Sequence, residues 1–269
     1  MPTELLLALS GLLAGAFGAL LGLGGGILIV PILSLGFGIP IASAVGTSLV
    51  CVIATSTGGA AVNVAAGRAD VRLGISLGAG TVVGAVTGAI IAGFLPERLL
   101  AGLFAALLAY TTVAMLRGSR GGGNPTRDES SSDPAAPDGP RAPAYRGTHL
   151  PAAVGGSFVA GNVSGLLGIG GGVVTVPLIH LVMRAPMRVA VATSNFMIGL
   201  TAAAGAYAYL FRGDIDPREA APVVVGVAAG AAIGARLSGR IRASWLAILF
   251  AGVMVYVTVQ MARRALGLV

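Results

Sequence analysis

The sequence predicts an all-α integral membrane protein made of two homologous helical repeats, each with a glycine-broken helical hairpin. Three observations predict this fold. Of the 269 residues, 55% are hydrophobic and only 10% are charged, against roughly 25% charged residues in soluble domains. Apolar runs recur along the chain, several of them long enough for a membrane-spanning helix. A glycine-rich decapeptide occurs twice, as GLGGGILIVP at 22–31 and as GIGGGVVTVP at 168–177.

Ten apolar runs, five on each side of a hydrophilic stretch, are the expected helical elements. They cover 4–22, 26–38, 41–66, 72–95, 98–117, 149–167, 172–183, 187–211, 217–239 and 243–266. The first run carries Glu4 in place of a positive leader region, which favours a membrane helix over a signal peptide. The hydrophilic stretch is rich in Gly, Pro, Ser and charge, which predicts a flexible linker. We therefore expect a first membrane repeat at 1–117, a linker at 118–148 and a second membrane repeat at 149–269.

A fixed offset of 146 residues aligns the two halves without a gap. Eight of the twelve residues at 20–31 are identical to those at 166–177. The same offset pairs Pro40 with Pro186, Thr47-Ser48 with Thr193-Ser194, Asp70 with Asp216, and Gly80, Gly84 and Gly88 with Gly226, Gly230 and Gly234. Chance does not hold one register over such a length, so the chain is expected to be a duplicated membrane bundle.

The number of elements in each half decides whether the repeats are inverted. If 4–22 and 26–38 are separate pieces, each half has five elements and the second half is inverted; one broken span would give four and parallel repeats. Inversion is favoured, because 4–38 is too long for one span of about 20 residues. Inversion puts twelve arginines on the linker side and five on the other, and the parallel arrangement gives eleven and six. Both counts predict a cytoplasmic linker in a multi-pass protein of the inner (plasma) membrane.

Several function classes are excluded by composition. All basic residues are arginines that fall between apolar runs, as membrane-interface anchors do, so the net charge of +7 does not indicate nucleic-acid binding. The single cysteine, Cys51, excludes an internal disulfide, and His149 and His180 lack ligand spacing, so no metal site is expected. The sequence shows no carboxylate pair and no nucleophile–base set, which argues against an enzyme.

The glycine motif does not fit a nucleotide-binding loop. A dinucleotide fingerprint needs G-x-G-x-x-G and a later acidic residue. Gly24 is followed at the required position by Ile27, and Gly170 by Val173. A Walker loop needs a Gly-Lys pair, and the chain has no lysine. No nucleotide and no other cofactor is expected.

In a membrane, three consecutive glycines interrupt a helix and free backbone groups that lipid cannot satisfy. The helix is expected to restart near Gly26 and near Gly172, with unpaired N–H groups at the positive end of its dipole. Two such ends brought together would form a site for a small anion near the midplane. Alternatively, the triple glycines serve only as close packing positions or hinges. Pro31 and Pro177 are expected to end or kink the short helices that follow.

Close packing is the expected role of Gly80, Gly84 and Gly88, which recur at four-residue spacing.

We expect the substrate to contact the triple glycines and the polar residues near them. The candidates are Gly24, Gly25, Gly26, Thr47, Ser48, Asn162, Gly170, Gly171, Gly172, Thr193, Ser194, Asn195 and Arg236. Hydroxyl and amide groups can donate to an oxyanion, although the hydroxyls can instead bond back to their own helix. Arg236 is either a buried oxyanion partner or a side chain that snorkels to the interface. Asn162, Ser164 and Asn195 have no polar counterpart in the first half, which predicts more polar contacts from the second half.

The L-x-G-x-GGG-x-x-x-x-P pattern at the start of each half, followed by an (A/G)-T-S segment, resembles the sulfite exporter TauE/SafE family. The resemblance covers both halves and omits the linker. It implies a secondary transporter of sulfite, a sulfonate or a related small organosulfur anion. The positions that match the family pattern are Gly24–Gly26, Gly170–Gly172, Thr47, Ser48, Thr193 and Ser194.

An ion gradient, with the proton as candidate coupling ion, or the membrane potential would drive transport, since no nucleotide motif is present. An anion channel, a carrier of a non-sulfur small anion and a membrane scaffold stay open as alternatives.

Overall fold

The structure is a computed structural model that describes residues 2–20, 26–65, 67, 69–120, 150–183, 185–237 and 243–267. Within these ranges the secondary structure is helical, with one short π-helix, η1. The helices of the first half are α1 (Pro2–Leu20), α2 (Gly26–Pro31), η1 (Ile32–Gly36), α3 (Ile41–Ala65), α4 (Val71–Phe94) and α5 (Glu97–Arg120). Those of the second half are α6 (Leu150–Leu167), α7 (Gly172–Val182), α8 (Met187–Phe211), α9 (Pro217–Leu237) and α10 (Ala243–Ala265). Each predicted apolar run is confirmed as a helix, and the predicted all-α class is confirmed.

Four helices are long and apolar enough to cross a membrane, judged by length and composition within the described residues. They are Ile41–Ala65, Val71–Phe94, Val189–Phe211 and Pro217–Arg236. The helix α7 has 11 residues and is therefore about 16 Å long. That is about half of a hydrocarbon core of about 30 Å, so α7 reaches only part of the way across.

The two prolines of the repeated decapeptide act differently. Pro31 ends α2, and the chain continues as the wider π-turn η1, because proline lacks an N–H and its ring clashes with the carbonyl four residues earlier. Pro177 lies inside α7, which continues to Val182. The prediction that both prolines end or kink the short helix is therefore confirmed for Pro31, whereas the helix α7 continues past Pro177.

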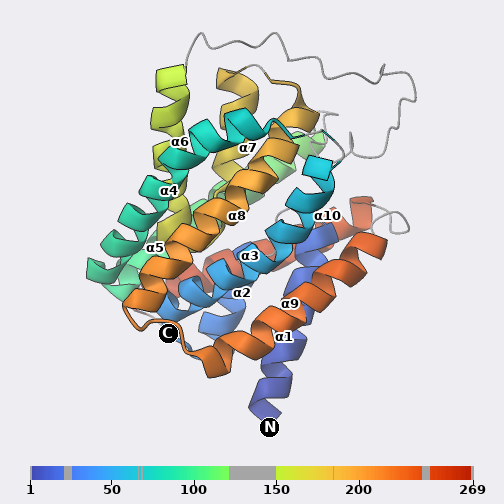
Figure 1. The fold of residues 1–269 in the computed structure, drawn as a ribbon. Helices are drawn as coiled ribbons and strands as arrows, with labels where there is room; N and C mark the ends of the chain where they lie inside the picture. Colours follow the sequence, from blue (N-terminus) through green and yellow to red (C-terminus); the bar gives the residue numbers. More distant parts are fainter. Residues whose placement is uncertain are drawn as a thin grey trace.

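Helices from the two halves of the sequence pack against each other throughout the bundle. The main pairs are α1 with α9, α4 with α6, α3 with α8, and α5 with α10. In Figure 1 the labels of α3 and α8 lie near the middle of the bundle, with α1 and α9 together on one side and α4 and α6 together on another. The core accordingly forms between α3 and α8, where Ala44, Val45, Leu49 and Val52 are at most 1% exposed.

Rows of glycine bring two of these helix pairs into backbone contact. On α4, Gly80, Gly84 and Gly88 lie against the carbonyl oxygens of Val154, Phe158 and Asn162 of α6. On α9, Gly226, Gly230 and Gly234 lie against those of Ala8, Leu12 and Ala16 of α1. The predicted packing role of these glycines is confirmed. The contacts advance in the same order on both members of each pair, so α1 runs parallel to α9, and α6 runs parallel to α4.

One end of the bundle, called the first end, joins the starts of α3 and α5 to the last turn of α10. The Ile41 N–H donates to Glu97 Oε1 at 3.0 Å. The Arg264 guanidinium donates to the carbonyl and the hydroxyl of Ser34 at 2.8 and 2.6 Å, and it lies 3.8 Å from Glu97 Oε1. The short hairpin of α1, α2 and η1 therefore returns to the first end.

The ends of α4 and α8 also meet at the first end. The Arg212 side chain donates to the Ala89 carbonyl at 2.5 Å and pairs with Asp214 at 2.7 Å. Because α4 and α8 end there, both begin at the opposite, second end. Asp70 caps α4 at the second end by accepting from the Leu73 N–H at 3.0 Å. The hairpin of α6 and α7 leads directly into α8, so it returns to the second end.

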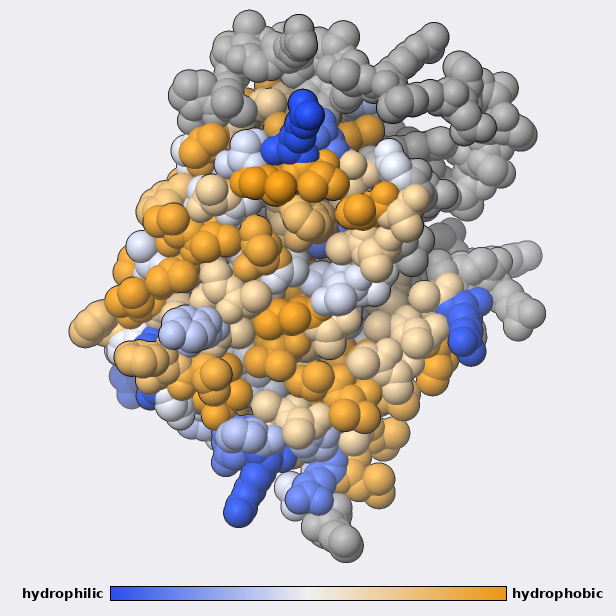
Figure 2. Space-filling view, viewed as in Figure 1, coloured by the Kyte–Doolittle hydropathy of each residue, from blue (hydrophilic) through white to orange (hydrophobic). Residues whose placement is uncertain are grey.

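The surface carries many large apolar side chains. The most exposed are Phe94, Phe211, Leu266, Leu5, Tyr207 and Val225, at 67–84%. Figure 2 shows hydrophobic residues over the middle of the visible face and most of the strongly hydrophilic residues near its margins. Such a belt suits contact with lipid rather than water.

Candidate functional site

The start of α2 at Gly26 and the second glycine break adjoin each other over α3. Ser48 of α3 is fully buried, and its hydroxyl donates to the carbonyl of Gly168 at 2.8 Å and to that of Gly26 at 3.1 Å. A β-carbon added at Gly26 would lie 2.9 Å from the Gly168 oxygen. The start of α2 and the second break are thus in direct contact. Of the first triple glycine, Gly24 and Gly25 lie outside the described residues.

The second break has a backbone that favours glycine. Gly168, Gly170 and Gly171 have φ angles of +71°, +79° and +80°, in the left-handed region that costs other residues about 1–2 kcal/mol. The helix α7 begins at Gly172, and its N-cap Gly171 offers no side chain to the first N–H groups. The predicted helix restart at Gly172 is therefore confirmed, and the start of α7 presents N–H groups that lack partners within the helix. In the first half α2 begins at Gly26, and the five residues before it lie outside the described ranges.

Three hydroxyl side chains from three helices surround the start of α7. Ser164 of α6 lies with its β-carbon 3.3 Å from a β-carbon added at Gly171, and Ser194 Oγ of α8 lies 4.0 Å from one added at Gly172. Thr175 of α7 donates to the Gly171 carbonyl at 2.6 Å. Ser164 and Ser194 are fully buried, and their hydroxyls find no hydrogen-bond partner in the described part of the chain. Two buried donors are thus free to bind a ligand.

Repeat-related serines therefore have different surroundings. Ser48 and Ser194 are 146 residues apart in sequence and occupy equivalent positions in α3 and α8. The Ser48 hydroxyl is used by two backbone carbonyls, whereas the Ser194 hydroxyl is unpaired within the described residues. Two of the three unpaired buried hydroxyls of the described residues, those of Ser164 and Ser194, therefore lie at the second break, beside α7, and the third is that of Ser157.

Two apolar side chains, Val52 of α3 and Ile198 of α8, lie against glycines of the breaks. A β-carbon added at Gly26 would lie 2.8 Å from Val52 Cγ2, and one added at Gly172 would lie 2.7 Å from Ile198 Cδ1. At Gly170 an added β-carbon would meet both side chains, at 2.7 and 2.9 Å. The sequence reasoning missed Val52 and Ile198, because apolar residues inside an apolar run give no signal. Their separation by the repeat offset of 146 residues is the feature that could have paired them.

The other predicted site residues have different surroundings. Thr193 is fully buried, and its hydroxyl accepts from the Asp70 N–H at 3.0 Å, which holds the start of α4. Asn162 donates to Thr87 Oγ1 at 3.1 Å and ties α6 to α4. Thr47 is buried in α3, 3% exposed. Asn195 is half-buried in α8.

Arg236 is exposed in the last turn of α9, so the structure places its side chain at the surface. This placement fits the snorkelling interpretation rather than a buried oxyanion partner.

Every buried polar residue in the described chain is a serine or a threonine. They are Ser34, Thr47, Ser48, Ser56, Thr81, Thr111, Thr112, Ser157, Ser164, Thr175, Thr193, Ser194 and Thr201. Among the described residues, no group of three or more His, Cys, Asp or Glu side chains gathers as metal ligands do. The buried chemistry of the bundle is therefore that of neutral hydrogen-bond donors and acceptors.

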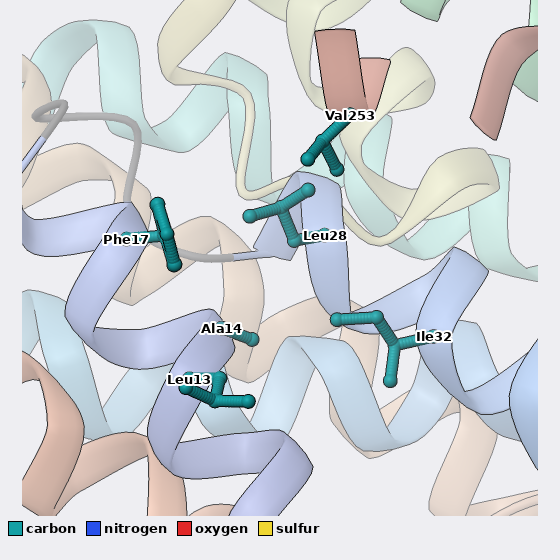
Figure 3. Close-up of a pocket in the computed structure, with 6 residues that line it drawn as sticks. All are labelled: Leu13, Ala14, Phe17, Leu28, Ile32 and Val253. Atoms are coloured by element: carbon teal, nitrogen blue, oxygen red, sulfur yellow. The ribbon is translucent and has the colours of Figure 1, made fainter. Parts of the chain in front are cut away.

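A cavity of about 150 Å³ lies between α1, α2, η1 and α10. Figure 3 shows its lining, which consists of Leu13, Ala14, Phe17, Leu28, Ile32 and Val253. These side chains offer no hydrogen-bond donor to an anion. The cavity is therefore unsuited to a small anion.

Comparison with known proteins extends over both halves. Residues 7–261 match the family model described as Sulfite exporter TauE/SafE. The chain is 27% identical to the Probable membrane transporter protein YunE of Bacillus subtilis (strain 168), over 95% of this chain and 96% of that protein. It is 29% identical to the Probable membrane transporter protein MJ0441 of Methanocaldococcus jannaschii, over 76% and 72% of the two chains. No solved structure matches the chain.

The matched region includes both glycine breaks, the central pair α3 and α8, and the helices that enclose them. The Bacillus subtilis relative is named a probable membrane transporter and matches along nearly the whole length, and the Methanocaldococcus jannaschii relative, with a similar name, matches 76% of this chain. The names and the family description agree with the apolar spans and indicate a transporter rather than an enzyme. The chain is thus a multi-pass membrane protein that belongs to the sulfite exporter TauE/SafE family of transporters.

Proposed function

We propose that the protein is a secondary transporter that moves sulfite or a related small organosulfur anion, such as a sulfonate, across the cell membrane. The observation that carries this proposal is the pair of free, fully buried hydroxyls beside the start of α7. Helix starts attract anions through their unpaired N–H groups and their dipole. The family description points to sulfite as the class of oxyanion.

The proposed substrate contacts are the backbone of Gly170–Gly172 and the hydroxyl of Ser194. The start of α2 at Gly26, with the preceding Gly24 and Gly25, would approach the anion from the first half. Ser48, which bonds to both breaks, is assigned to holding them together. Thr193, through its bond to Asp70, is assigned to positioning α4 beside α8.

We further propose that the two halves are inverted repeats. The hairpin of α1, α2 and η1 returns to the first end of the bundle, and the hairpin of α6 and α7 returns to the second end. The equivalent pairs α1–α9 and α4–α6 pack through equivalent glycines. With the linker at the second end, twelve of the seventeen arginines lie on that side, which favours a cytoplasmic linker.

Transport by such a protein would alternate the access of one central site between the two faces. Each hairpin covers the centre from its own side, so separation of α6 and α7 from the core would open the site to the second end. Opening at the first end would need the hairpin of α1 and α2 to part from α3. The proton is the proposed coupling ion, and a pH gradient is therefore a variable in the test below.

The direct test is flux of labelled sulfite into liposomes that contain the purified full-length protein. We expect uptake that saturates with sulfite concentration, with turnover typical of a carrier, and a rate that responds to an imposed pH gradient. Empty liposomes are the control. Absence of uptake of sulfite and of simple sulfonates would contradict the proposed substrate class, and single-channel currents in planar bilayers would indicate an anion channel instead.

A further inference from the structure

We propose that the second break binds a singly charged oxyanion, and that Ser164 of α6 is one of its ligands. This inference rests on the proposed function and deepens it by naming the charge state of the substrate. Sulfonates and hydrogensulfite carry one negative charge, whereas sulfite and sulfate carry two. The reasons are the number of free donors at the break and the absence of a positive charge among its described neighbours.

The donors at the break are few and come from separate helices. Ser164 lies on α6, before the break in the chain, and Ser194 lies on α8, after it. Both hydroxyls are fully buried without a partner in the described ranges. The start of α7 at Gly172 adds backbone N–H groups between them. Two hydroxyls and one helix start can satisfy the oxygens of a single –SO3⁻ group.

The charge at this site must be balanced without a cationic side chain. The side chains of Arg212 and Arg264 are 27% and 23% exposed, and both lie at the first end. The other arginines whose side chains are described are exposed. The buried polar residues of the described chain are hydroxyls only. One helix start contributes the equivalent of about half a positive charge.

Burying an ion costs a free energy that rises with the square of its charge, so a second charge makes burial about four times as costly. A site of neutral donors with a single helix start therefore favours the monoanion.

The walls of the site also suit a sulfonate. Val52 and Ile198 lie against Gly170 on either side, and Ile198 also lies against Gly172. These apolar side chains can face the organic group of R–SO3⁻ while the hydroxyls face its oxygens. A dianion has no such apolar part and would leave this wall in contact with charge.

The first experiment compares three probes in liposomes that contain the full chain. Methanesulfonate keeps one charge at every pH used, sulfate keeps two, and sulfite passes from one to two near neutral pH. We expect methanesulfonate uptake at least tenfold above sulfate uptake. Below saturation, the ratio of sulfite to methanesulfonate uptake should fall by about tenfold per pH unit above the second ionisation of sulfite.

Normalising to methanesulfonate removes any pH effect of the protein itself, because that probe does not titrate. Sulfate uptake equal to methanesulfonate uptake, or a ratio that stays flat or rises with pH, would overturn the monoanion assignment while leaving sulfur-anion transport intact. Absence of uptake of all three probes would instead overturn the proposed function.

The second experiment tests Ser164 against a matched control on the same helix. Ser157 of α6 is also fully buried with an unpaired hydroxyl in the described ranges, but it lies two turns before Ser164, about three turns before the break, and contacts α4 near Gly80. We expect Ser164→Ala to raise the KM for methanesulfonate about tenfold and Ser157→Ala to leave it unchanged within about twofold. Equal KM values for the two variants would remove Ser164 from the site.

Discussion

At the residue scale, the duplicated sequence predicts equal roles for Ser48 and Ser194, and the structure gives them different ones. The repeat identifies both serines as candidates, because a polar pair recurs at one offset inside an apolar run. The repeat cannot identify which serine has a partner. The Gly168 carbonyl oxygen that accepts from Ser48 Oγ at 2.8 Å belongs to a residue 120 positions away in the chain. Ser164 has no polar counterpart in the first half, so only the structure relates it to Ser194.

The two equivalent serines should respond oppositely to removal of the hydroxyl. Ser48→Ala leaves the buried Gly168 carbonyl without its donor, so we expect the free energy of unfolding to fall by about 1–3 kcal/mol. Ser194→Ala removes no bond within the described chain, so stability should change by less than about 0.5 kcal/mol while the KM for transport rises. Thermal unfolding in detergent, together with liposome uptake, measures both effects. A larger loss of stability in Ser194→Ala than in Ser48→Ala would contradict the assignment.

At the element scale, the sequence predicted the helix restart at Gly172 correctly and the effect of proline only in part. Three consecutive glycines together cost a helix about 3 kcal/mol relative to alanine, which makes the restart at Gly172 predictable from local chemistry. Pro177 is the sixth residue of α7, which continues to Val182 although the proline removes one N–H from the interior of the helix. The π-turn after Pro31 was not predictable from the proline alone, because the equivalent Pro177 leaves α7 unbroken.

The helix start at Gly172 allows packing to be separated from substrate contact. In Gly172→Ala the new methyl group would lie 2.7 Å from Ile198 Cδ1, and this flexible end can rotate at a cost of about 1 kcal/mol. The double variant Gly172→Ala/Ile198→Val should relieve this contact and recover thermal stability. If the anion approaches the backbone, the double variant should still transport poorly, because the methyl group remains. Recovery of both stability and uptake would show that Gly172 serves packing alone.

At the scale of the whole molecule, periodicity predicted how many helices there are but not which of them pair. The apolar runs indicate the number and the length of the elements, because the longer runs match the thickness of the bilayer and the shorter ones, such as that of α7, give helices that cross only part of it. The pairing of α1 with α9 and of α4 with α6 arises from complementary rows of glycine whose partners lie far apart in sequence. The four-residue spacing indicated a packing role without indicating the partner helix.

Inversion of the halves predicts opposite exposure for two equivalent prolines. Pro40 lies before α3 and Pro186 before α8, 146 residues apart in sequence and both exposed. In a Cys51→Ser background, cysteine at position 40 should react with a membrane-impermeant maleimide added outside the cell. Cysteine at position 186 should react only after the membrane is opened. Labelling of both positions from the same side would indicate parallel repeats.

The pairing of α1 with α9 has a consequence for biosynthesis. Roughly 200 residues separate the two helices in the chain, and chains are made at about 5–20 residues per second. The face of α1 that later lies against Gly226, Gly230 and Gly234 of α9 must therefore stay in contact with lipid or with a chaperone for about 10–40 seconds. The nascent bundle closes only after most of the chain has left the ribosome, so insertion of this protein is most vulnerable to quality control late in synthesis.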